Sequence, residues 1–74
     1  MDVVLTSRSN PKQEVRFWTG QNWSPKYRDA EHYYSEADFE WVINHRIAAR
    51  YFPITAVNRY SKETSETAAY HHRP

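Results

Sequence analysis

The chain has no cysteine, a single glycine and no long apolar run, and each shortage excludes a class of protein. Without cysteine there is no disulfide framework, no cysteine nucleophile and no thiolate metal site. One glycine excludes a glycine-rich phosphate-binding loop. No window approaches the ~18 apolar residues of a spanning helix, and the start lacks the roughly 7–15 apolar residues of a secretory signal. We therefore expect a cytoplasmic protein that does not associate with a membrane.

The chain also lacks an excess of charge of either sign. Ten basic and nine acidic side chains leave a formal net charge of +1 over 74 residues. This balance argues against a strongly basic nucleic-acid packer and against an acidic mimic that acts by charge alone. A chain this short has room for one domain, and its single core gives only a few kcal/mol, on the order of 3–5.

Aromatic side chains, in contrast, are abundant. Three Trp, six Tyr and three Phe make up 16% of the chain. Phe is usually buried, whereas Trp and Tyr, together with Arg, are enriched at the centres of protein interfaces. The excess of Trp and Tyr over Phe therefore favours a protein-binding surface.

A hairpin is predicted near the start. Residues 13–18 alternate between two faces, so that Phe17 and Trp18 point in opposite directions. The tetrad 19–22 contains Gly20 and an asparagine, and both residue types tolerate the positive φ of a tight turn. This turn makes Trp18 and Trp23 cross-strand neighbours.

A helix is predicted after Ser35, which is a good N-cap and is followed three residues later by Asp38. Pro53 ends this helix at about Tyr51 or Phe52. An apolar stripe at a spacing of four residues comprises Phe39, Ile43, Ile47 and Tyr51. Trp41 lies about opposite this stripe, whereas Arg46 and Arg50 fall near its centre, where they either snorkel outward or form a basic ledge.

The remaining segments complete an α+β fold. Residues 2–6 form a short strand or an ordered arm, residues 30–34 a short edge strand, and residues 54–60 a closing strand rich in β-branched residues. We expect a small antiparallel sheet of three or four strands, hairpin first, with one helix packed on one face and then a final strand. This single domain covers residues 1–60, and residues 61–74 form a flexible polar tail. The predicted inward set is Val15, Phe17, Ala30, Phe39, Ile43, Ile47, Ile54 and Val57.

Catalytic and metal-binding patterns are weak. Glu36, Asp38 and Glu40 crowd the first turn of the predicted helix, where carboxylates complement the helix dipole. His71 and His72 are adjacent, a spacing that does not build a closed four-ligand site. We therefore expect a protein that is not an enzyme, with no catalytic residue, no metal and no cofactor.

Nucleic acid is an alternative partner. Trp18 and Trp23 precede Lys26, Tyr27 and Arg28, and aromatic rings beside basic side chains can stack on bases. The near-zero net charge weighs against it, because phosphate binding normally needs a positive excess.

A series of positions between residues 15 and 60 follows a pattern of aromatic strand, turn, tyrosine before a capped helix, and a final strand that ends in Val-x-Arg. Its residues are Phe17-Trp18-Thr19-Gly20, Trp23, Ala30, Tyr34-Ser35-Glu36, Pro53 and Val57-Asn58-Arg59. This pattern resembles the small inhibitor proteins that bacteriophages and prophages encode. It is similar in size to anti-CRISPR proteins and in element order to the podophage-encoded inhibitor of bacterial RNA polymerase.

The resemblance implies a non-enzymatic protein that binds a bacterial host complex, either a defence system such as CRISPR-Cas or the transcription machinery, and inhibits or redirects it by steric occlusion. It also implies a contact through Arg59, at the end of the final strand. With that residue, the predicted partner-binding set is Trp18, Trp23, Trp41, Arg46, Arg50 and Arg59. The alternatives are a single-stranded nucleic-acid or nucleoprotein-binding module and a structural protein that assembles with its own copies, for instance as a homodimer.

Overall fold

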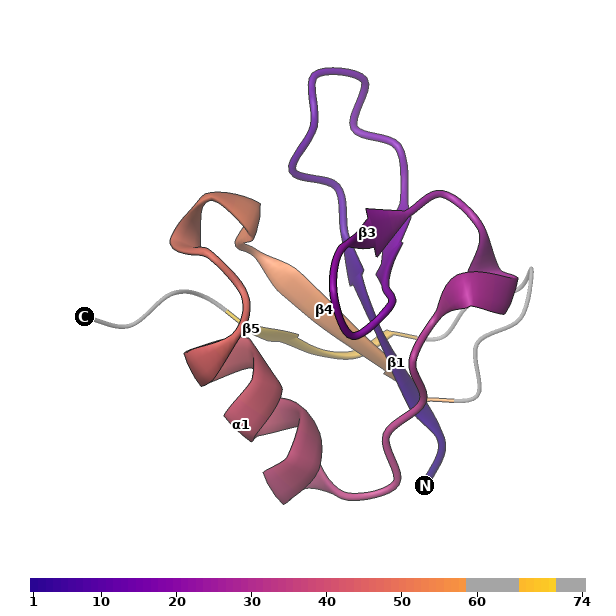
Figure 1. Cartoon of the computed structure of the whole chain (residues 1–74), viewed down its shortest axis with the longest axis vertical. Coiled ribbons are helices and arrows are strands. Elements are labelled where there is room, and N and C mark those ends of the chain that lie inside the picture. Colours follow the sequence, from indigo (N-terminus) through magenta and orange to yellow (C-terminus); the bar gives the residue numbers. More distant parts are fainter. Residues whose placement is uncertain (59–65, 71–74) are drawn as a thin grey trace.

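A five-stranded antiparallel sheet with one α-helix against one face forms the fold (Figure 1). The computed structural model describes residues 1–58 and 66–70. The elements in chain order, with η for a short 3₁₀ turn, are β1 (Val3–Ser7), β2 (Arg16–Trp18), β3 (Trp23–Ser24), η1 (Tyr27–Asp29), α1 (Glu36–His45), η2 (Ala49–Tyr51), β4 (Ile54–Asn58) and β5 (Glu66–Tyr70). The strand order is β3-β2-β1-β4-β5. The predicted α+β class, with an antiparallel sheet and one helix on one face, is confirmed.

Strand β1 lies at the centre of the sheet. It pairs with β4 along its whole length, from Val3 opposite Asn58 to Ser7 opposite Ile54, and its far end pairs with β2. All five of its residues are buried. Of the two readings of this segment, strand or arm, the strand is correct, and it supplies the fully buried Leu5 to the core.

The predicted hairpin is present between β2 and β3. Trp18 and Trp23 are directly opposite in the ladder, and their rings meet edge to face with centroids 5.4 Å apart. Gly20 has a φ of +100°, a conformation that side chains disfavour. The Thr19 N–H donates to the Asn22 carbonyl at 2.9 Å and closes the turn.

Helix α1 begins as predicted, because the Ser35 hydroxyl accepts the N–H of Asp38 at 3.3 Å. The predicted end at Tyr51 or Phe52 is wrong: α1 ends at His45, and η2 follows after the extended Ala48. An unbroken helix would place Arg46 and Arg50 at the centre of the apolar stripe. The break leaves both arginines exposed, while Ile47 is only 7% exposed and stays in the core.

The sheet buries apolar side chains on both faces, whereas the prediction placed them in one inward set. The face toward α1 packs Trp18, Leu5 and Ile54 against Phe39 and the other apolar helix residues. The opposite face buries a smaller cluster of Val4, Phe17 and Val57, with Val15 and Ala30 packed against it. The alternation of Phe17 and Trp18 was therefore correct, but Trp18, not Phe17, faces the helix. The pairing of β2 with the central β1 sets this orientation.

Two segments differ from their predictions. Residues 30–34 form a single bridge between Tyr33 and Val3, with two hydrogen bonds of 2.8 Å, rather than an edge strand. Glu66–Tyr70, predicted as part of the flexible tail, is β5 and pairs with the outer edge of β4. The free backbone groups of that edge account for this pairing, which side-chain composition does not reveal. The rest of the predicted tail, residues 61–65 and 71–74, lies outside the described residues.

Candidate functional site

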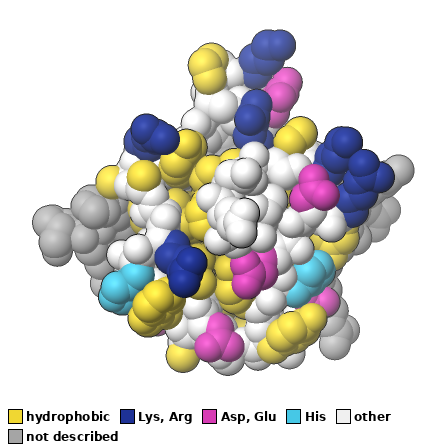
Figure 2. Space-filling model, in the orientation of Figure 1, with side chains coloured by type: hydrophobic (Ala, Val, Ile, Leu, Met, Phe, Trp, Pro, Cys, Tyr) yellow, Lys and Arg dark blue, Asp and Glu magenta, His cyan; other side chains and the backbone are white. Residues whose placement is uncertain are grey.

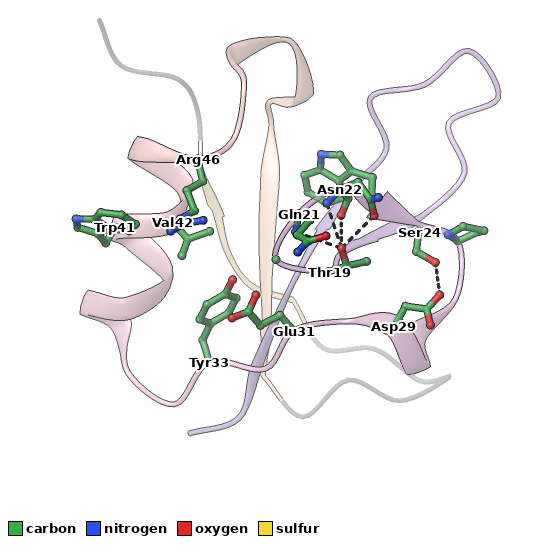
Figure 3. A pocket seen from close by; sticks show the side chains of 13 residues that line it. Thr19, Gln21, Asn22, Ser24, Asp29, Glu31, Tyr33, Trp41, Val42 and Arg46 are labelled. Atoms are coloured by element: carbon green, nitrogen blue, oxygen red, sulfur yellow. Dashed lines mark hydrogen bonds between the residues drawn. The ribbon is translucent and has the colours of Figure 1, made fainter.

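A broad cavity of about 970 Å³ separates the hairpin from α1 (Figure 3). We call it the hairpin cleft and define it by the turn residues 19–22, Glu31, Tyr33, Val42 and Arg46. The hairpin forms one wall and the helix the other, and the segment that leads into α1 forms the floor. The cleft therefore exists only because the fold brings three separate segments together.

Tyr33 and Glu31 lie side by side in the floor of the cleft (Figure 3). Tyr33 is 6% exposed. Burial raises the pKa of Tyr33 above its ordinary value near 10, and the carboxylate of Glu31 raises it further. The Trp18 indole and the charge of Arg46 lower the pKa of Tyr33, but their effect is smaller than that of burial and Glu31.

Glu31 is held in place by the hairpin. Its N–H donates to the Trp18 carbonyl at 2.9 Å, and its carboxylate fills the space beside Gly20 that a Cβ atom would occupy. Gly20 therefore serves two purposes, the positive φ of the turn and the close approach of a carboxylate.

A second cavity of about 430 Å³ lies next to the hairpin cleft, between the hairpin, the end of β1 and η2. We call it the arginine pocket and define it by Arg16, Trp18, Trp23, Arg46, Arg50 and Tyr51. It shares Trp23 and Arg46 with the wall of the hairpin cleft. The wall beside η2 is fastened by two hydroxyl donors: Ser7 to the Tyr51 carbonyl at 2.7 Å and Ser9 to the Phe52 carbonyl at 3.1 Å.

The polar groups of the arginine pocket are unbalanced. Within residues 1–58, no carboxylate lines it or lies within ion-pair distance of Arg16, Arg46 or Arg50. Arg16 Nε and the indole nitrogen of Trp23 are buried with no hydrogen-bond acceptor in the described structure.

Trp41 stands on the outer rim of the hairpin cleft. It is 51% exposed and stacks on His45, with ring centroids 4.7 Å apart. The guanidinium carbon of Arg46 lies 5.5 Å from the centre of the Trp41 ring, a cation–π distance. Figure 2 shows basic, histidine and hydrophobic side chains gathered on the helix side of this face. We call Trp41, His45 and Arg46 the helix rim.

The structure brings together most of the predicted partner-binding residues. Trp23, Arg46 and Arg50 line the arginine pocket, and Arg46 is also beside Trp41. Trp18 is a correction: it is 5% exposed and belongs to the core, because its strand face is the one that α1 covers. Arg59 lies outside the described residues.

Sequence reasoning missed Arg16, Glu31 and Tyr33. The alternation of β2 places Arg16 on the same strand face as Trp18, and this signal could have identified it. Glu31 and Tyr33 carry no such signal, because their position depends on a single bridge to β1.

Comparisons with models of protein families, with curated proteins and with solved structures find no match. Among the described residues, no three His, Asp or Glu side chains lie close enough together to hold a metal ion. Nor does any described helix combine the length and apolar character needed to cross a membrane.

Proposed function

We propose that this chain is a non-enzymatic, phage-type protein that binds a bacterial protein complex and inhibits or redirects it by steric occlusion. The target is a defence system such as CRISPR-Cas or the transcription machinery. The observation that carries this proposal is Trp41, a tryptophan 51% exposed in the middle of the only α-helix of the described chain.

An exposed tryptophan of this kind is suited to be an interface anchor. Stacking on His45 and the charge of Arg46 restrict the Trp41 ring before any partner arrives, which reduces the entropy lost on binding. Tryptophan and arginine are also the residue types that most often dominate binding energy. The hairpin cleft beside this rim offers a concave surface for a protruding part of the partner.

Affinity purification from bacterial lysate, with quantitative mass spectrometry, tests this proposal. We expect the wild-type protein to enrich the subunits of one complex, and Trp41→Ala to reduce their recovery at least ~10-fold, as for a binding hot spot. Tyr34→Ala is the matched control, because Tyr34 is 68% exposed but precedes the N-cap of α1 and lines neither cavity.

Equal recovery of the same proteins by wild type and Trp41→Ala, with both variants folded by circular dichroism, would contradict the proposal. A lysate complex that disappears on nuclease treatment would favour the nucleic-acid alternative. Light scattering that shows a stable homodimer, with Trp41 in its interface, would favour self-assembly.

A further inference from the structure

We propose that the arginine pocket is a binding site for the phosphate monoester group of a small molecule. This site adjoins the helix rim, with which it shares Arg46, and its ligand does not depend on the proposed protein partner.

Arginine side chains dominate the polar lining of the pocket. Arg16, Arg46 and Arg50 all line it, and Arg16 Nε and the indole nitrogen of Trp23 lie beneath its surface with no acceptor in the described chain. The Arg50 guanidinium donates to the Tyr51 hydroxyl at 3.0 Å and lies over that ring, with its carbon 4.9 Å from the centroid. A ligand group that only accepts hydrogen bonds is the natural complement of such a lining.

The charge of the pocket is equally one-sided. Three arginines line one cavity, and none of the acidic residues within 1–58 lines it. This local excess points to an anion with more than one negative charge.

A phosphate monoester fits these features better than a carboxylate does. It carries a charge of about −1.5 to −2 near neutral pH and presents three terminal oxygen atoms, whereas a carboxylate has one charge and two oxygens. Arginine forks match the spacing of phosphate oxygens with paired hydrogen bonds.

The volume and the walls indicate a molecule larger than a bare anion. About 430 Å³ lies within the range of small-molecule sites, roughly 300–1,000 Å³. Trp23 and Tyr51 form an aromatic side of the cavity, with ring centroids 5.7 Å apart. Ser7 and Ser9 fasten η2 to the end of β1, so the walls are formed before a ligand enters.

Nitrogen-15 NMR titration tests the site, with ribose 5-phosphate and inorganic phosphate as probes at constant ionic strength. We expect saturable shifts of the Trp23 indole and Arg16 Nε–H signals with ribose 5-phosphate, and weaker binding of inorganic phosphate. Ribose and sodium chloride should cause no such shifts.

Arginine variants locate the binding. Arg16→Gln should weaken the binding of ribose 5-phosphate at least tenfold, and Arg50→Gln should do the same. Because Arg50 is exposed, the Arg50→Gln variant still tests the site if Arg16→Gln fails to fold. Arg28→Gln is the control, since Arg28 is an exposed arginine in η1 that does not line the pocket.

Three results would overturn the proposal. One is the absence of saturable shifts at millimolar probe. Another is an equal loss of affinity in Arg50→Gln and Arg28→Gln, which would indicate general charge attraction. The third is succinate binding as tightly as ribose 5-phosphate, which would assign the pocket to carboxylates instead.

Discussion

At the scale of single residues, Tyr33 makes the stability of the protein sensitive to high pH. Its folded-state pKa is raised above the unfolded value near 10, so the folded chain holds its proton more tightly. The stabilisation is fully present below about pH 10 and is lost as the pH rises beyond it. The loss is at most about 1.4 kcal/mol per pH unit, and solvent in the open cleft reduces it.

Urea unfolding of wild type and Tyr33→Phe at pH 8 and pH 11 measures this effect. We expect wild type to lose stability relative to Tyr33→Phe between the two pH values. Tyr34→Phe, which removes an exposed hydroxyl next in sequence, should behave as wild type does. Parallel loss in wild type and Tyr33→Phe would show that the Tyr33 hydroxyl is not perturbed by its surroundings.

Individual side chains also show how far sequence reasoning reached. The positive φ of Gly20 and the Ser35 cap were predictable, because each depends on neighbours within one turn. The exposure of Trp41 was left open, because another segment of the chain could have packed against its ring. The burial of Trp18 was not, because alternation separates two strand faces without saying which one the helix covers.

At the scale of elements, the Ser35 cap sets the start of α1. This helix has ten residues, too few to be stable by propensity alone. Ser35→Ala removes the acceptor of the Asp38 N–H and should lower the free energy of unfolding by about 1 kcal/mol. Ser35→Asp, which restores an acceptor, should recover most of it in the same urea titration. A Ser35→Ala variant as stable as wild type would mean that tertiary packing, not the cap, fixes the helix start.

The ends of elements were predicted less well than their starts. The apolar spacing of Ile43, Ile47 and Tyr51 fits one long helix. The helix in fact ends before Arg46, and Tyr51 packs against the core from η2. Two arginines in the stripe were the sign of this break. β5 could not be predicted, because it depends on backbone pairing with an edge of β4.

At the scale of the whole molecule, the order of strands decides where the functional surfaces lie. β1 pairs with β2 and β4, so the hairpin lies on one side of the centre and the chain after α1 lies on the other (Figure 1). The two cavities form between segments that are separate in the sequence, such as those of Arg16 and Arg50. Composition predicted a binding surface rich in Trp and Arg, but only the assembled sheet shows that it divides into a helix rim and an arginine pocket.

Site-specific photo-crosslinking in bacterial cells tests the central claim, that the helix rim meets a protein partner. One variant would keep Trp41 and carry p-benzoylphenylalanine in place of the adjacent, exposed His45, and a second variant would carry it in place of Tyr34. We predict that His45→p-benzoylphenylalanine yields a discrete crosslinked band containing a subunit of a bacterial complex, and that the Tyr34 variant does not. The absence of a crosslink at position 45, or equal crosslinks at both positions, would contradict the account.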